Sequence, residues 1–256
     1  MTLKTLISGF GKAKINTLTK YPSILTLHQL GEKGRLTDDF TTDLANESLF
    51  ATEKIDGTNV RVICLGGDYL LGSREFLLHH SGDLFFDPAQ TIVESLRTLN
   101  FTPPKTNCLT VFYGELFGGK VTANSKQYGV DAVGFRIFDV ATFEDLSILE
   151  RDIKDISNWR EHNSPNGLAY GQNFLTYDQI KDQFPELNLV PEVKFQMEDT
   201  SHQSVLNALR AYLATTNVAL TDSALLKPEG VILRNLSRTK IVKVRYEDYE
   251  RTLKQK

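Results

Sequence analysis

The chain has 256 residues, 41% of them hydrophobic, and its 29 basic and 32 acidic side chains give a formal net charge of -3. This length and composition can supply a substantial core, whereas the charge balance excludes a strong overall positive field, so any polyanion contact needs a local patch. Two cysteines, Cys64 and Cys108, are too few for a disulfide framework. The N-terminus lacks the apolar core of a secretion signal, and no apolar run approaches the ~18 residues of a membrane span. We expect a soluble, cytoplasmic protein without membrane contact.

Residues 1–50 mix short apolar groups with turn-forming residues, and we expect them to form an irregular N-terminal lead-in. Two β-rich runs follow at 51–55 and 59–65, and Asp56-Gly57 between them is typical of a β-hairpin turn. His79-His80 has no Cys or carboxylate at a zinc-binding spacing and predicts an exposed pair in a loop. Residues 89–99 have the apolar spacing of a helix, and Pro88 fits its first turn.

Residues 108–116 and 132–140 are rich in β-branched and aromatic side chains and predict strands. The region 145–213 is more helical, with helices expected over 177–184 and 204–214. Two further strands, 230–235 and 240–245, end the chain. Because strands and helices do not alternate regularly, we expect an α+β fold of largely antiparallel sheets flanked by helices. It would form a single domain over 1–256, without a C-terminal OB-fold or helical domain.

Five segments place polar or charged residues in or beside these strands, where a bare core would take apolar ones. They are EKIDGTN (53–59), GSREF (72–76), YGELFGG (113–119), GFRIFD (134–139), and PEGVILR with KIVKVR (228–234 and 240–245). Each segment alone is common in proteins with no shared function. In this order they resemble the motifs of covalent nucleotidyltransferases, the polynucleotide ligases and mRNA capping enzymes. The G-T-N after the lysine and the G-E-L-F-G segment are most similar to the RNA ligase 2-like branch, so the resemblance implies the ligase adenylation fold.

The resemblance also implies a role for each matching residue. Lys54 would be the catalytic nucleotidyl acceptor, with Glu229 and Lys243 completing the catalytic set. The implied nucleotide-binding residues are Glu53 at the base edge, Lys54, Asn59 at metal-bound water, Arg74 and Glu115 near the ribose, Phe135 stacked on the purine, Glu229 as the metal ligand, and Lys243 and Arg245 at the α-phosphate. Arg245 departs from the family's usual K-x-K. The implied cofactors are ATP and Mg²⁺ or Mn²⁺.

A lysine amine with its ordinary pKa of ~10.4 is mostly protonated at neutral pH and cannot attack phosphorus. Neighbouring cations and burial lower such a pKa. If the last strand lies beside the first, Lys243, Arg245 and a bound divalent metal would supply these cations to Lys54.

The function implied is that of an ATP-dependent RNA ligase acting in RNA repair. It would adenylylate its own lysine, pass AMP to the 5′-phosphate of an RNA end, and seal that end to a 3′-hydroxyl. Its partners would be RNA ends and an end-processing or end-binding protein. Two alternatives stay open. One is a DNA ligase or a GTP-dependent mRNA capping guanylyltransferase, and the other is a non-catalytic nucleotide or nucleic-acid binding protein.

Overall fold

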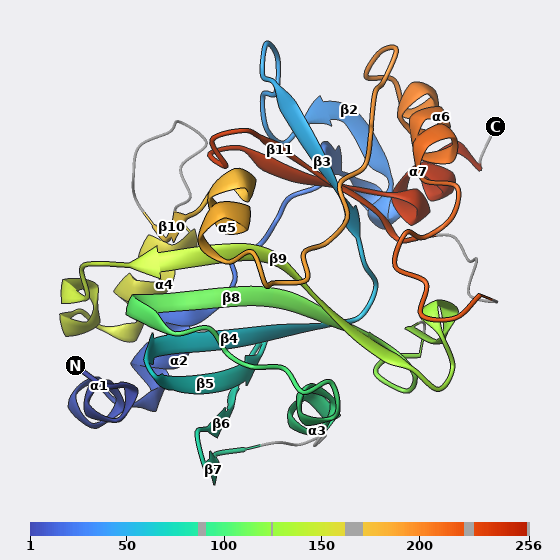
Figure 1. Cartoon of the computed structure of the whole chain (residues 1–256). Helices are drawn as coiled ribbons and strands as arrows, with labels where there is room; N and C mark the ends of the chain where they lie inside the picture. Colours follow the sequence, from blue (N-terminus) through green and yellow to red (C-terminus); the bar gives the residue numbers. More distant parts are fainter. Residues whose placement is uncertain (87–90, 124, 162–170, 223–227, 255–256) are drawn as a thin grey trace. The chain divides into compact units, whose positions relative to one another are not determined.

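A computed structural model describes residues 1–86, 91–123, 125–161, 171–222 and 228–254 (Figure 1). The chain divides into two compact units, each built from three separate segments. Unit 1 comprises Met1–Pro22, Gly57–Phe117 and Val133–Leu189, and unit 2 comprises Ser23–Asp56, Gly118–Ala132 and Val190–Lys256. Pro88, expected in the first turn of a helix, lies outside the described residues. The expected single nucleotidyltransferase domain stays a prediction.

Unit 1 is built on a seven-stranded sheet with the order β10-β9-β8-β4-β5-β6-β7. The strands are β4 (Thr58–Gly66), β5 (Asp68–Ser73), β6 (Leu77–His80), β7 (Asp83–Leu84), β8 (Thr106–Gly118), β9 (Val133–Phe143) and β10 (Asn173–Phe174). β4 pairs antiparallel with both β5 and β8. The α+β class with antiparallel sheets is therefore confirmed.

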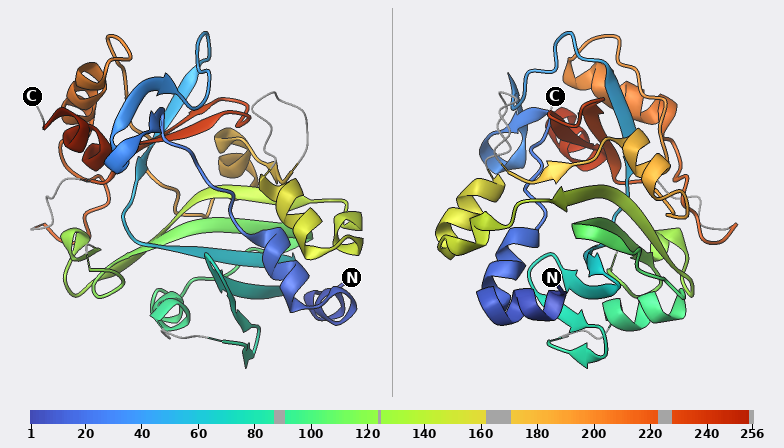
Figure 2. Two further views of the ribbon diagram at one scale, coloured as in Figure 1. Left: turned by 180° about the vertical axis from the view of Figure 1, so that it is seen from behind. Right: turned by 60° about the vertical axis from the view of Figure 1, so that its left-hand side comes forward.

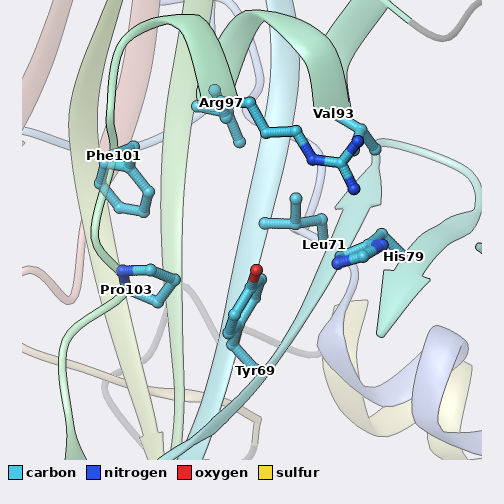
Figure 3. A pocket seen from close by; sticks show the side chains of 8 residues that line it. Tyr69, Leu71, His79, Val93, Arg97, Phe101 and Pro103 are labelled. Atoms are coloured by element: carbon cyan, nitrogen blue, oxygen red, sulfur yellow. The ribbon is translucent and has the colours of Figure 1, made fainter. Parts of the chain in front are cut away.

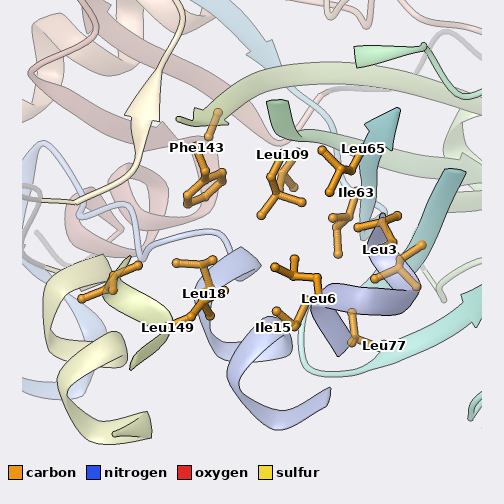
Figure 4. Packing of buried hydrophobic residues seen from close by; sticks show 14 of the residues in the cluster. Leu3, Leu6, Ile15, Leu18, Ile63, Leu65, Leu77, Leu109, Phe143 and Leu149 are labelled. Carbon is orange, nitrogen blue, oxygen red and sulfur yellow. The ribbon is translucent and has the colours of Figure 1, made fainter. Parts of the chain in front are cut away.

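The helices of unit 1 are α1 (Leu3–Phe10), α2 (Lys12–Thr19), α3 (Thr91–Thr98), α4 (Ile153–Glu161) and α5 (Tyr177–Gln183). The first two, α1 and α2, fall in the segment that was expected to be irregular. Leu3 and Leu6 of α1 and Leu18 of α2 are buried in one cluster with Ile63 and Val111 of the sheet (Figure 4). The expectation of an irregular lead-in over 1–50 is therefore wrong for these helices, whose apolar residues recur at helical spacing.

Unit 2 contains a three-stranded antiparallel sheet, order β12-β11-β3, and a separate two-stranded pair, β1 and β2. The strands are β1 (His28–Leu30), β2 (Leu36–Phe40), β3 (Leu49–Lys54), β11 (Gly230–Asn235) and β12 (Ile241–Arg245), and the helices are α6 (His202–Tyr212) and α7 (Tyr246–Leu253) (Figure 2). Val205 and Leu209 of α6 and Tyr249 of α7 share a buried cluster with Val231 and Val244 of the sheet. Both predicted C-terminal strands are confirmed. Within the described ranges, no helix is both long and apolar enough to cross a membrane.

The expected hairpin around Asp56-Gly57 does not form. β3 pairs with β11 in the three-stranded sheet, whereas β4 belongs to the seven-stranded sheet. The backbone N–H of Asp56 donates to the Tyr128 hydroxyl at 2.8 Å, and that of Gly57 donates to the Glu115 carboxylate at 3.1 Å. Residues distant in sequence thus accept hydrogen bonds from the backbone N–H groups of this turn. The local composition alone could not distinguish a hairpin from a connection between strands of two different sheets.

We expect Gly57→Ala to destabilise the protein by about 1–3 kcal/mol, the usual cost of overpacking. A Cβ at this position would lie 2.2 Å from the carbonyl oxygen of Leu116, a backbone atom that cannot turn aside. Gly67→Ala is the matched control, since a Cβ there meets nothing within 4 Å. Urea unfolding of both variants measures the effect, and equal stability of the two would contradict this account of Gly57.

Candidate active site

Lys54, the last residue of β3, forms an ion pair with Glu229, which immediately precedes β11. The antiparallel register pairs Lys54 with Gly230, so the two side chains meet at one end of the sheet. The Nζ atom of Lys54 donates to the Glu229 carboxylate at 2.5 Å. The two side chains are 26% and 21% exposed. An amine and a carboxylate 175 positions apart in the sequence therefore form a pair that solvent can reach.

Two further cations, Lys243 and Arg245, occupy alternate positions of β12. Gly230 pairs with Lys54 on one side and with Arg245 on the other, and Ile232 pairs with Lys243. Since directly paired residues of antiparallel strands point to one face and residues two apart share it, Lys54, Lys243 and Arg245 lie on the same face. The last strand does not lie directly beside the lysine strand, because β11 pairs with both of them and separates them.

Asp248 in the first turn of α7 holds Arg245 in place. The Nε and Nη2 atoms of Arg245 each donate to the Asp248 carboxylate at 2.8 Å, and Nη1 lies 4.0 Å from Glu229. Burial alone would lower the pKa of Arg245, but the hydrogen bonds and charge of the buried Asp248 raise it above its ordinary value. Asp248 was not among the expected site residues. An Arg-x-x-Asp spacing across a strand-to-helix boundary was the available signal.

The surroundings of Lys243 disfavour its charged form. Its pKa is lowered by burial first, and then by the positive charges of Arg245 and Lys54. Three cations, Lys54, Lys243 and Arg245, face two carboxylates, Glu229 and Asp248. The group has a net positive charge and suits a phosphate-type anion, which would relieve the repulsion between the cations.

The stability difference between wild type and Lys243→Met is expected to shift in favour of wild type as the pH rises towards the ordinary lysine pKa of 10.5. Because the folded-state pKa of Lys243 lies below the ordinary 10.5, the unfolded chain binds more protons in this window. The free energy of unfolding of wild type therefore rises with pH through the window by a contribution that the variant lacks. Urea unfolding at several pH values measures the difference, and a difference independent of pH would contradict the shift.

Glu53 does not join this group. It pairs with Val231, on the face of the sheet opposite to Lys54, and only 2% of it is exposed. Its carboxylate accepts hydrogen bonds from the Thr216 hydroxyl at 2.5 Å and from the Asn217 backbone N–H at 2.8 Å, and burial raises its pKa. These contacts anchor the 216–217 segment to β3. The expected role at the base edge stays a prediction.

Asn59 and Glu115 lie together in unit 1. They are directly paired across β4 and β8. The Oδ1 atom of Asn59 is buried and has no hydrogen-bond partner within the part of the chain that the structure describes. Glu115 accepts the N–H of Gly57. A buried acceptor without a donor fits a bound water or ligand, and the expected role of Asn59 at metal-bound water stays a prediction.

Phe135 lies on the other face of this sheet. A Cβ built on Gly114 would lie 2.4 Å from the Phe135 ring, so the ring covers the face of the sheet at Gly114. Since neighbouring residues of a strand face opposite sides, Glu115 points to the other face. The Phe135 ring also makes an edge contact with Phe101, with the centroids 5.2 Å apart. The purine-stacking role of Phe135 stays a prediction.

Phe138 lies three residues after Phe135 on β9 and points to the opposite face of the sheet. The ring centroids of Phe138 and Tyr21 are 5.0 Å apart, and those of Tyr21 and Tyr113 are 4.9 Å apart. Phe138 therefore packs on the face of the sheet to which Tyr113 points, and Glu115, two residues further along β8, points to the same face. The odd spacing between residues 135 and 138 predicts this difference, because strand residues an odd number apart point to opposite faces.

Arg74 lies in the turn between β5 and β6. Its side chain is 66% exposed and lies 3.9 Å from Glu75. Among the expected site residues, the structure thus groups Lys54, Glu229, Lys243 and Arg245 in unit 2, and Asn59 with Glu115 in unit 1. Glu53 points away from the unit 2 group, and Phe135 points away from the unit 1 pair.

The Glu229 carboxylate fits a divalent metal ion whose other ligands are substrate phosphates and waters. Among the described residues, no group of three or more His, Cys, Asp or Glu side chains could hold a metal ion. Mg²⁺ in phosphate-handling sites is usually bound by one or two carboxylates, with substrate phosphates and waters completing the shell. The Glu229 carboxylate in unit 2 is a suitable single protein ligand for such an ion.

A separate small pocket of about 40 Å³ lies on unit 1 between β5, β6 and α3 (Figure 3). Its lining includes Tyr69, His79, Arg97 and Phe101, and none of the predicted site residues. His79 is only 3% exposed, and His80 lies 2.9 Å from Asp68. The expected exposed loop pair is therefore wrong, because both histidines belong to β6, which pairs with β5.

One protein-family model matches most of this chain. Residues 47–247 match the family model described as RNA ligase, and the chain therefore belongs to the RNA ligase family. The expected family is confirmed, and the match includes Lys54, Glu229, Lys243 and Arg245. Among curated proteins, none matched the sequence.

Several solved structures of Naegleria gruberi RNA ligase are similar to this chain. A mutant with AMP and Mn is 14% identical, with 92% of this chain and 65% of that chain covered and a TM-score of 0.46. A mutant with ATP and Mn is 13% identical, with coverages of 93% and 63% and a TM-score of 0.45. An apo mutant is 14% identical, with coverages of 94% and 62% and a TM-score of 0.47. The chain therefore spans less than two thirds of these structures.

Proposed function

We propose that this protein is an ATP-dependent RNA ligase whose Lys54 accepts AMP covalently. The observation that carries the proposal is the 2.5 Å pair of Lys54 and Glu229, on one sheet with Lys243 and Arg245. Membership of the RNA ligase family supports ligation as the overall reaction. The net positive group supports a phosphate-bearing substrate at this end of the sheet.

The chemistry follows from these side chains. An ammonium group paired with a carboxylate has no lone pair, so Lys54 must lose a proton to Glu229 or to water before it can attack. Its nitrogen then forms a bond to the α-phosphorus of ATP, while the bond to the bridging oxygen breaks and pyrophosphate leaves with that electron pair. Lys243 and Arg245 would neutralise the α-phosphate oxygens. A divalent metal, when bound, supplies further charge neutralisation, with Glu229 as its protein ligand.

The later steps are proposed from the family. AMP would pass from Lys54 to the 5′-phosphate of an RNA end, and a 3′-hydroxyl would then displace AMP and seal the strand. RNA repair is the proposed setting, and a protein that prepares or holds RNA ends is the proposed partner.

Intact-protein mass tests the first step. Wild type is incubated with Mg²⁺ and either ATP or GTP, after a check that it is folded and not already adenylylated. We expect a gain of one AMP with ATP alone. A GMP adduct would indicate a capping guanylyltransferase, and no adduct with either nucleotide would favour a non-catalytic binding protein. Sealing of nicked RNA, but not of nicked DNA, then tests the choice of substrate, and the reverse preference would indicate a DNA ligase.

A further inference from the structure

The turn Ser73–Phe76 between β5 and β6 is held firmly from within unit 1. Within the turn, the Ser73 N–H donates to the Phe76 carbonyl at 2.8 Å, and the Ser73 hydroxyl accepts from the backbone N–H groups of Glu75 and Phe76. From outside it, Arg61 donates to the Ser73 carbonyl at 2.7 Å, and Asn16 donates to the Glu75 carbonyl at 2.8 Å. The turn is therefore fixed, and the side chains that it exposes are presented in set positions.

The two largest side chains of this turn point to solvent. Arg74 has 66% of its side chain exposed, and Phe76 is 50% exposed. Phe86, which is 52% exposed, follows β7 and returns alongside β6, where its N–H donates to the Leu78 carbonyl. The rings of Phe76 and Phe86 meet edge to face, with their centroids 5.5 Å apart. We call Arg74, Phe76 and Phe86 the aromatic platform.

The charges around the platform are mixed. Lys12 lies over the ring of Phe85, the residue before Phe86 in the sequence, at 4.3 Å. Glu75 is paired with Lys20 at 2.5 Å, so much of its negative charge is compensated. Asp83 is the exposed acid nearby, 3.8 Å from His80. Two half-exposed rings in edge-to-face contact and the exposed guanidinium group of Arg74 combine aromatic surface with a charge that can bind phosphate.

We propose that the aromatic platform binds an unpaired stretch of an RNA strand, with bases stacking on Phe76 and Phe86 and a phosphate paired with Arg74. Aromatic rings beside cations are the usual means of binding single strands, since every base has a face that can stack. The planar guanidinium group of Arg matches the geometry of phosphate oxygens. This inference rests on the proposed RNA ligase function and identifies where the strand would be held beyond the reacting ends.

Fluorescence anisotropy with a labelled single-stranded RNA tests the platform. Phe76→Leu and Phe86→Leu keep apolar bulk but remove the ring, and each is expected to weaken binding about fivefold to a hundredfold. Phe76→Tyr should bind like wild type. Phe40→Leu is the matched control, since Phe40 is a 43% exposed ring in unit 2. Arg74→Gln should reduce the slope of log affinity against log salt by about 0.7, the value for one phosphate contact of a single strand.

The outcomes separate the platform from the proposed enzymatic function. Unchanged affinity in the Phe76→Leu/Phe86→Leu double variant would overturn the platform, and so would equal wild-type affinity for a blunt duplex. The double variant should still form the ATP adduct at the wild-type rate, since neither ring belongs to the Lys54 group. If wild type forms no adduct, the ligase function fails, but the binding comparison still decides whether the platform holds RNA.

Discussion

Lys54→Ala is expected to abolish the covalent nucleotide adduct completely, because alanine offers no nucleophile to the α-phosphorus. The fold should persist, since Lys54 ends its strand and its side chain is partly exposed. Intact-protein mass after incubation with Mg²⁺ and ATP measures the adduct, and thermal unfolding confirms the folded state.

The chain offers a matched control for this substitution. Lys240 pairs with Glu47 at 2.8 Å in the same unit, and its side chain is 22% exposed, so Lys240→Ala removes a similar lysine from a similar ion pair. This variant should form the adduct normally. An adduct on Lys54→Ala, or its loss from Lys240→Ala alone, would show that the acceptor has been wrongly assigned.

Glu229→Ala is expected to slow adduct formation by about a hundredfold or more, the scale seen when one group is removed from a preorganised charged site. Two losses combine. The carboxylate that pairs with Lys54 and could receive its proton disappears, and so does the proposed protein ligand for the metal. Lys54, Lys243 and Arg245 are also left with less opposing charge. The initial rate of adduct formation at several Mg²⁺ concentrations measures the effect.

Glu47→Ala serves as the control, because it breaks the Lys240 ion pair and leaves Glu229 in place. Its rate should stay near that of wild type. Should Glu229→Ala keep the full rate at every metal concentration, Glu229 would have no part in the chemistry, and its pairing with Lys54 would be structural only.

Much of the fold could be predicted from local patterns. The strands at 230–235 and 240–245 and the helix around Val205 and Leu209 have apolar spacing that predicts their type directly. The prediction failed at Asp56-Gly57, because a turn signal does not identify the partner of the strand that follows. It also failed at residues 1–22, where short helices gain their stability from packing on the sheet and not from composition alone.

The sequence by itself determined the family, the types of the main elements and the candidate nucleophile. Each motif around Lys54, Glu229 and Lys243 is one continuous stretch of sequence and can be recognised without knowing its partners in space. Only the tertiary structure decided which side chains meet. The Lys54–Glu229 pair depends on the register of β3 and β11, and strand geometry places Glu53 on the face opposite to Lys54 and Phe135 on the face opposite to Glu115. The anchoring of Arg245 by Asp248, and the Asn59 oxygen that has no partner among the described residues, also became visible only there. The physical reason is that periodicity along one strand fixes which residues share a face, whereas pairing between distant strands is set by the packing of the whole chain.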